Sequence, residues 1–198
     1  LPIKKGTKIA VIGPHADSLR YPVSGYTYPA YIEMMDAGRK NSAAVTFNGI
    51  ADEQAKAEKE KAPKGPFDTL FDMLDEEDVK QLDDMNGVLR TLHTRSLKEV
   101  LSDRFETVYA QGCDIIGTSE DGFSDVVKAA NESDVVVMAL GGNCGWVNVT
   151  GGEGKDRQSL ELPGVQEKLL ETVAATGKPV VLVLYLSLIH ISEPTRRS

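Results

Sequence analysis

Residues 135–157 read VVVMALGGNCGWVNVTGGEGKDR. The apolar run at 135–140 predicts a buried strand, and the glycines that follow it predict a loop. A helix is expected to begin near Pro163, so this loop lies at the carboxyl end of a strand. Open α/β sheets bind their ligands at that edge. Within the loop a single carboxylate, Glu153, stands between glycines, which makes it a candidate functional residue.

Other short apolar runs have the same character and predict further strands. They cover residues 8–13, 107–112 and 179–185. A capping box at Ser96 and Glu99 precedes one predicted helix. Residues 123–130 keep helical spacing, and another helix is expected from Pro163 to a stop at Gly177. The alternation of strands and helices predicts an α/β fold, a three-layer sandwich with a mostly parallel sheet and helices on both faces.

The predicted domain covers residues 1–185. Within it, residues 36 to about 93 exceed the length that a crossover needs, and they are interpreted as a surface insertion. Their Lys/Glu/Ala-rich part, 51–64, is typical of a solvated helix face or a flexible linker. Residues 186–198 resemble a translated sequencing adapter and are expected to be non-native. On that interpretation the chain is a gene fragment whose sheet is incomplete at the C-terminus.

The composition argues against several classes of protein. With 41% hydrophobic and 26% charged residues in 198, the chain can form one sizeable core. A net charge of −8, with lysines interleaved among acids, argues against a nucleic-acid partner. No run approaches the ~20 apolar residues of a membrane span. The cysteines, Cys113 and Cys144, lack metal-ligand spacing, so no metal or cofactor is expected; free thiols are favoured over a disulfide, which stays open.

Glu153 suits three chemical uses: general acid/base catalysis, metal binding or recognition of hydroxyl groups. Metal binding is the weakest, because hard cations need several oxygen ligands and the loop offers few besides Glu153 and Asp156. Phosphate binding is also poor, since the GxGxxG spacing fails and an acid beside the glycines repels phosphate. Acid/base catalysis fits best, because a mobile glycine-rich loop can bring a carboxyl group to a substrate held elsewhere.

Neighbouring side chains on the same loop suit a sugar. Asn143 carries an amide for hydroxyl groups, and Trp146 carries an indole face for the ring. Trp146 fits equally well as a partly buried anchor of the loop. Asp156 and Arg157 are interpreted as a local ion pair that holds the loop, in preference to direct contacts with a substrate.

Five sequence blocks, in this order, carry a resemblance to a known family. They are KIAVIGP at 8–14 with Ala16-Asp17, GYTYPA at 25–30, YAQGCD at 109–114, EGKDR at 153–157 and LELPGVQ at 160–166. Together they resemble the C-terminal α/β-sandwich domain of glycoside hydrolase family 3. The resemblance covers residues 1–35 and about 94–185 and leaves most of the predicted insertion unexplained.

The resemblance implies part of a retaining β-glycosidase that hydrolyses terminal non-reducing β-linked sugars, with a β-glucoside or oligosaccharide as substrate. In that family an aspartate nucleophile lies on a preceding barrel domain, and a glutamate of the sandwich domain is the general acid/base. Glu153 matches that glutamate. The barrel domain is the partner that these 198 residues lack, so the chain alone is expected to be inactive. The resemblance implies no cofactor.

Three alternatives stay open. A β-xylosidase of the same family fits as well as a β-glucosidase in this half of the enzyme. A non-catalytic carbohydrate-binding or interaction module and a nucleotide-binding α/β domain, which the strand-glycine pattern suggests, rank lower. The compartment in which the protein works is also left open by the sequence.

Overall fold

The computed structural model of the protein describes residues 3–23, 25–40, 45–46, 49–50, 80, 84–145, 149–151, 157 and 159–186, and it contains one main sheet. Its strands are β1 (Lys8–Ile12), β4 (Glu106–Ala110), β5 (Val135–Gly141) and β6 (Val180–Tyr185). They lie in the order β4-β1-β5-β6, and every neighbouring pair is parallel. The predicted parallel α/β fold is therefore confirmed for the described chain.

The strands end at one common edge, which we call the carboxyl edge. Ile12 lies opposite Ala110 of β4 and Met138 of β5, and Gly141 lies opposite Tyr185 of β6. The segments that leave these strands consequently start side by side. Two of them matter below: the β4 loop, residues 111–122, and the β5 loop, by which we mean the described residues 142–145, 149–151, 157 and 159–165.

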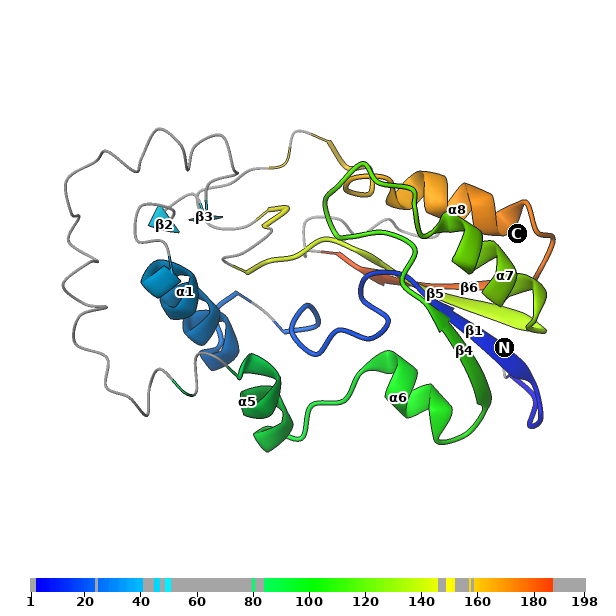
Figure 1. Ribbon diagram of the computed structural model, residues 1–198, viewed down its shortest axis with the longest axis horizontal. Coiled ribbons are helices and arrows are strands. Elements are labelled where there is room, and N and C mark those ends of the chain that lie inside the picture. Colours follow the sequence, from blue (N-terminus) through cyan, green and yellow to red (C-terminus); the bar gives the residue numbers. More distant parts are fainter. Residues whose placement is uncertain are drawn as a thin grey trace, which may run out of the picture.

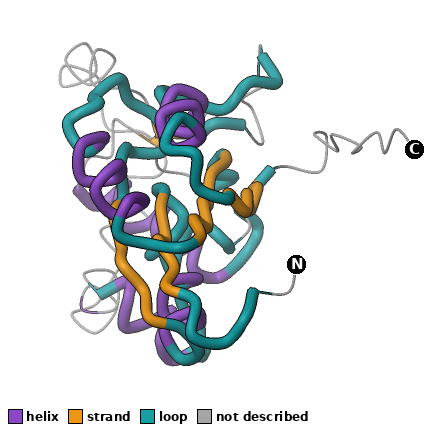
Figure 2. The backbone as a smooth tube through the Cα atoms, turned by 90° about the vertical axis from the view of Figure 1, so that its right-hand side faces the viewer, coloured by secondary structure: helices purple, strands orange, loops and turns teal. Residues whose placement is uncertain are grey.

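Helices cover both faces of the sheet (Figures 1 and 2). They are α6 (Leu97–Ser102) on one face, and α7 (Phe123–Asn131) and α8 (Gln166–Ala174) on the other. Alternate residues of β1 serve the two cores: Ala10 and Ile12 pack on the side of α7 and α8, and Ile9 and Val11 pack on the side of α6. All four side chains are 0% exposed. Burial of a valine or isoleucine side chain, such as Ile9, Val11 or Ile12, stabilises the fold by about 1.5–3 kcal/mol, and the smaller Ala10 contributes less.

Local signals explain where two of the helices begin. The predicted capping box precedes α6: Ser96 Oγ accepts from the Glu99 N–H, and Glu99 Oε2 accepts from the Ser96 N–H. The helix expected from Pro163 begins three positions later, at Gln166. Gly164 adopts a φ of 59°, a left-handed conformation that interrupts a helical first turn.

A smaller cluster lies beside the sheet. It contains α1 (Tyr28–Lys40), α5 (Met85–Thr91) and the antiparallel pair β2 (Val45–Thr46) and β3 (Gly49–Ile50). Ile32 and Met35 of α1 pack with Met85 of α5. β2, β3, α5 and residues 36–40 of α1 fall within the predicted insertion at 36–93, while the first part of α1 precedes it. The Lys/Glu/Ala-rich stretch at 51–64 lies outside the described residues, and so do the predicted adapter residues from 187. The extent of the insertion and the start of the adapter tail therefore stay predictions.

Candidate active site

The chain leaves β1 through a tight turn that brings His15 beneath the end of β5. Gly13 has a φ of 113°, and an added Cβ there would lie 2.3 Å from the Ala139 carbonyl oxygen. The His15 N–H then donates to that same carbonyl at 3.3 Å. The glycine is required because a side chain at this position would collide with the backbone of β5.

His15 is fully buried and holds the first residue of the β5 loop. Its Nε2 lies 2.9 Å from the Gly142 carbonyl oxygen, which accepts the hydrogen bond. The imidazole stacks on the Tyr185 ring, with centroids 4.6 Å apart and planes at 9°, and lies at a tilt beside Tyr21. Burial lowers the pKa of His15 to about 4, against the smaller opposing effect of the Gly142 carbonyl. At neutral pH the ring is therefore uncharged, with its proton on Nε2.

Gln166 holds the last residue of β5 from the opposite side. Its Oε1 accepts from the Gly141 N–H at 2.8 Å, and its Nε2 donates to the Gly141 carbonyl at 2.8 Å and to the Ile115 carbonyl at 2.9 Å. The side chain is 0% exposed. One amide thus joins the ends of β5 and α8 to the β4 loop.

Asn143 and Thr150 close the described start of the β5 loop on itself. The Asn143 N–H donates to Thr150 Oγ1 at 2.9 Å, and the Thr150 N–H donates to the Asn143 carbonyl at 3.0 Å. The Asn143 side chain is 1% exposed, so in this structure it offers no open surface to a ligand. Its predicted contact with sugar hydroxyls stays a prediction.

A buried ion pair lies against the next glycine of the loop. Arg20 Nη2 and Glu33 Oε2 are 2.8 Å apart, their side chains are 9% and 14% exposed, and Arg20 Nη1 donates to the Val23 carbonyl at 2.7 Å. A Cβ on Gly145 would lie 2.4 Å from Arg20 Nη2. This pair therefore forms the surface on which the loop rests where it approaches Trp146 in the sequence.

The structure describes two of the predicted site residues. These are Asn143 and Arg157; Trp146, Glu153 and Asp156 lie outside the described residues. The Arg157 guanidinium donates to the Glu161 carbonyl, a contact that holds the far part of the β5 loop. The role predicted for Arg157, an ion pair with Asp156 that holds the loop, stays a prediction.

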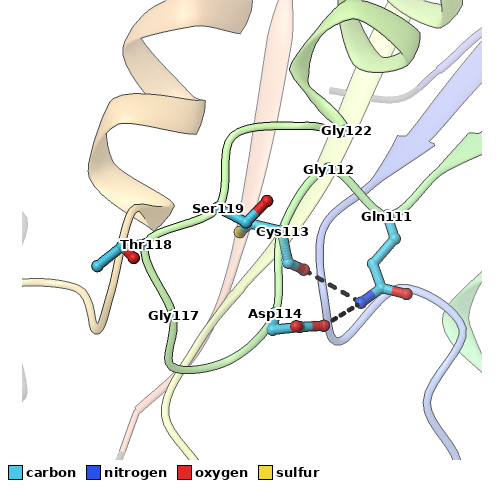
Figure 3. Close-up of a pocket in the computed structure, with 8 residues that line it drawn as sticks. All are labelled: Gln111, Gly112, Cys113, Asp114, Gly117, Thr118, Ser119 and Gly122. Carbon is cyan, nitrogen blue, oxygen red and sulfur yellow. Dashed lines mark hydrogen bonds between the residues drawn. The ribbon is translucent and has the colours of Figure 1, made fainter.

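A pocket that sequence reasoning missed lies in the β4 loop. It has a volume of about 450 Å³, and polar side chains of Gln111, Asp114, Thr118 and Ser119 line it (Figure 3). Gln111 Nε2 donates to the Cys113 carbonyl at 3.2 Å and to Asp114 Oδ1 at 2.9 Å. Glycines at 112, 117 and 122, five positions apart, were the signal that could have revealed it.

The thiol that borders this pocket is not activated as a nucleophile. Burial raises the pKa of the Cys113 thiol to about 11, so it stays protonated and is a poor nucleophile. Cys113 and Cys144 are both free, as predicted.

In the described part of the chain no cluster of three or more His, Cys, Asp or Glu side chains could hold a metal ion. No helix among the described residues is long and apolar enough to span a membrane.

Histidine and glutamine anchors of the β5 loop had no sequence signal. His15 acts on Gly142 across 127 positions, and Gln166 acts on Gly141 across 25 and on Ile115 across 51. Such partners are joined by the sheet topology, not by spacing along the chain. The quoted LELPGVQ block contains Gln166, but the block alone does not say what that side chain touches.

Comparison with known proteins places the chain in a family. The glycosyl hydrolase family 3 C-terminal domain matches residues 1–195. A β-xylosidase of Formosa agariphila is 42% identical over 101 residues, which is 49% of this chain and 13% of that protein. A periplasmic β-glucosidase of Salmonella typhimurium is 27% identical over 185 residues, which is 93% of this chain and 19% of that protein.

Solved structures agree on the fold. A family 3 exo-β-xylosidase bound to a xylobiose aziridine probe has a TM-score of 0.52 at 19% identity, covering 92% of this chain and 16% of that chain. A β-glucosidase of Listeria innocua bound to glucose has a TM-score of 0.52 at 22% identity, covering 93% and 17%. The chain thus spans less than a fifth of the length of these relatives. From the family match over nearly its whole length, the chain belongs to the glycosyl hydrolase family 3 C-terminal domain family.

Proposed function

We propose that this chain is the part of a retaining β-glycosidase that supplies the general acid/base, Glu153. The observation that carries the proposal is the anchored start of the β5 loop. Gly141, Gly142 and Asn143 are each held by hydrogen bonds from other segments or from across the loop. The loop then leads, at the carboxyl edge where α/β sheets bind ligands, into the segment that contains Glu153.

The chemistry needs two carboxyl groups about 5 to 5.5 Å apart. In the first step the Glu153 carboxyl group protonates the glycosidic oxygen while a carboxylate of the barrel domain bonds to the anomeric carbon and the leaving group departs. In the second step the Glu153 carboxylate takes a proton from water, the water oxygen bonds to the anomeric carbon, and the barrel carboxylate is released. The barrel partner is part of this proposal, because the chain itself forms the sandwich domain.

Glu153 must be protonated for the first step, which requires a pKa above the usual range for glutamate. Burial or the negative charge of the nucleophile would raise the pKa of Glu153, and a neighbouring cation would lower it. Arg157 is the cation nearest to Glu153 in the sequence, and its guanidinium donates to the Glu161 carbonyl. In this proposal the contact with the Glu161 carbonyl directs the Arg157 guanidinium to a partner other than the Glu153 carboxyl group.

The substrate is a β-linked glucoside, with a β-xyloside as the second candidate. Similarity to the Salmonella β-glucosidase extends over 93% of the chain and supports the first, and the 42% identity with the Formosa β-xylosidase supports the second. Parallel assays with aryl β-glucoside and aryl β-xyloside separate them by the ratio of kcat/KM values.

The test joins this chain to the barrel domain of a family 3 β-glucosidase and compares Glu153→Ala with the unmutated fusion. With an aryl substrate that has a good leaving group, the first step needs little acid, so the deficit falls on the second step, where water needs a base. We expect kcat to fall by about 100-fold or more. Azide needs no base, and it should restore turnover with a glycosyl azide as product.

The matched control is Glu132→Ala, which removes an exposed glutamate beside the amino end of β5. It should leave kcat within about twofold of the unmutated fusion. Equal thermal unfolding of both variants excludes misfolding as the cause of a difference. Turnover by Glu153→Ala as fast as that of the unmutated fusion would overturn the assignment. The chain without a barrel is expected to show no hydrolysis of either aryl glycoside.

A further inference from the structure

His15 is a buried side chain to which the acid/base chemistry assigns no role. It is 0% exposed and lies at the carboxyl edge, in contact with the first residue of the β5 loop. A buried histidine costs stability when its ring nitrogens lack partners. Among the described residues Nδ1 of His15 has no hydrogen-bond partner. The hydrogen bond from Nε2 to the Gly142 carbonyl is therefore the polar interaction that explains why a histidine is buried at this position.

We propose that His15 is a positioning residue that fixes the Gly142 carbonyl and thereby orients the β5 loop toward catalysis. The inference rests on the proposed role of Glu153 for its link to activity. His15 itself does not touch the reacting atoms in this proposal; it acts through the backbone of the loop.

The geometry makes the imidazole a rigid donor. The Gly142 carbonyl can accept but not donate, so Nε2 carries the proton. The ring is held on one face by Tyr185 at 4.6 Å and lies against Tyr21 at 5.5 Å. The backbone of His15 is fixed separately by its N–H bond to Ala139. A donor held from three directions gives the carbonyl one preferred orientation.

Gly142 is the position at which such a donor matters. Glycine has no side chain that restricts its dihedral angles, so hydrogen bonds must set the direction of its peptide groups. Its N–H is held by the Tyr185 carbonyl at 2.9 Å and its carbonyl by His15. The peptide that contains this carbonyl also contains the Asn143 N–H, which donates to Thr150 Oγ1. Rotation of that peptide would break the contact that closes the loop.

The test measures amide hydrogen exchange by NMR in the full chain. His15→Phe keeps a flat ring for the contact with Tyr185 and removes the donor, and His15→Leu is a smaller variant for the same measurement. We expect the Gly142, Asn143 and Thr150 amides to exchange about tenfold faster relative to the Val137 amide of β5. His15→Gln retains an N–H donor of similar reach and should keep these ratios within about threefold.

The matched control is Val11→Ala, a buried β1 variant on the same face of the sheet. It lowers global stability without removing a hydrogen bond of the loop, so it should speed exchange of the loop amides no more than that of Val137, which lies opposite Val11 in the sheet. If His15→Phe and His15→Leu raise the ratio of the loop amides to Val137 no more than Val11→Ala does, the positioning role of His15 is overturned.

Kinetics in the barrel fusion test the link to catalysis. His15→Phe should lower kcat by about tenfold with KM within about twofold, and His15→Gln should restore most of kcat. Unchanged kcat in His15→Phe overturns that link. Fast loop exchange in His15→Phe together with full activity in Glu153→Ala supports the positioning of the loop and overturns the role of Glu153. Unchanged exchange together with an inactive Glu153→Ala overturns the positioning role alone.

Discussion

The β4 loop and the start of the β5 loop leave adjacent regions of the same sheet edge, yet they are held in different ways. The β4 loop is mostly exposed, and Gln111 bonds locally to Asp114. The contacts of this loop with distant residues include the Ile115 carbonyl, which accepts from Gln166, and the exposed Glu120–Lys168 ion pair. The β5 loop begins with bonds from distant residues, His15 and Gln166. The open pocket belongs to the first loop and the fixed backbone to the second. Catalysis requires groups held in place, so the fixed backbone supports the site proposed around Glu153 better than the pocket volume supports a site in the β4 loop.

The largest expected difference between the two loops concerns glycines. Gly141 has a φ of 147°, and an added Cβ would lie 2.0 Å from the Tyr185 carbonyl oxygen, whereas a Cβ on Gly117 would meet its nearest neighbour at 3.9 Å. Gly141→Ala should lower the free energy of unfolding by about 4 kcal/mol or prevent folding. Gly117→Ala should stay within about 0.5 kcal/mol of the unmutated chain. Urea unfolding of both variants measures this, and equal losses would contradict the comparison.

Glutamine side chains provide the second test. Gln166→Leu leaves the Gly141 N–H and the Gly141 and Ile115 carbonyls without their buried partner, so we expect a loss of about 3 kcal/mol in the free energy of unfolding. Gln111→Leu removes the hydrogen bonds of an exposed side chain in the β4 loop and should cost less than about 1 kcal/mol. Chemical denaturation at neutral pH compares them. A Gln111→Leu loss as large as that of Gln166→Leu would show that both loops are held alike.

The smallest expected effect depends on pH. The pKa of His15 is lowered by burial from 6.5 to about 4, so the unfolded chain binds more protons than the folded chain between these values. Stability should therefore fall as the pH drops through this window, by about 2 kcal/mol between pH 7 and pH 5. Urea midpoints across this range measure the effect. His15→Gln should remove the part of the pH dependence of stability that His15 causes. If His15→Gln lost stability with falling pH as steeply as the unmutated chain, a buried neutral His15 would be contradicted.

A second pH window lies lower and belongs to another part of the molecule. The hydrogen bond from Arg90 is the main cause that lowers the pKa of Glu99 to about 2, and the Ser96 N–H adds to it. This carboxylate contributes stability above its unfolded pKa of 4.5, and the contribution is lost as the pH falls toward 2. Between pH 7 and pH 5 the Glu99 carboxylate stays ionised in both the folded and the unfolded chain for the most part, so the change in stability over that range reports on His15.

The sequence predicts much of the sheet because β1 and β5 are short apolar runs bounded by glycine, at Gly13 and Gly141. The observed β5, Val135–Gly141, contains the apolar run predicted at 135–140 and extends one residue further, while the strand expected at 107–112 ends at Ala110. Gln111 already bonds within its own loop, and Gly112 has a φ of 81°, which is incompatible with a strand. Local apolar patterns thus predict strands, and backbone turns decide their ends.

The anchors of the site could not be predicted from the same patterns. Neither His15 nor Gln166 has a neighbour in the sequence that hints at its partner, because the partner is reached through the strand order β4-β1-β5-β6. Glu153 stands out in the sequence because glycines surround it and because the segment around it resembles a family motif. Both signals lie within a few residues of Glu153. Contacts across the sheet depend on three-dimensional register, and a single sequence carries no direct record of it.

The strand order also bears on how the protein folds. β1 is the first strand in the chain but lies inside the sheet, and its partners begin at Glu106 and Val135. During synthesis its apolar side chains leave the ribosome long before either partner exists. Pairings between such distant segments make folding slow and expose unpaired strands to aggregation. A chaperone that shields residues 8–12 until β5 has been made would therefore raise the yield of folded protein.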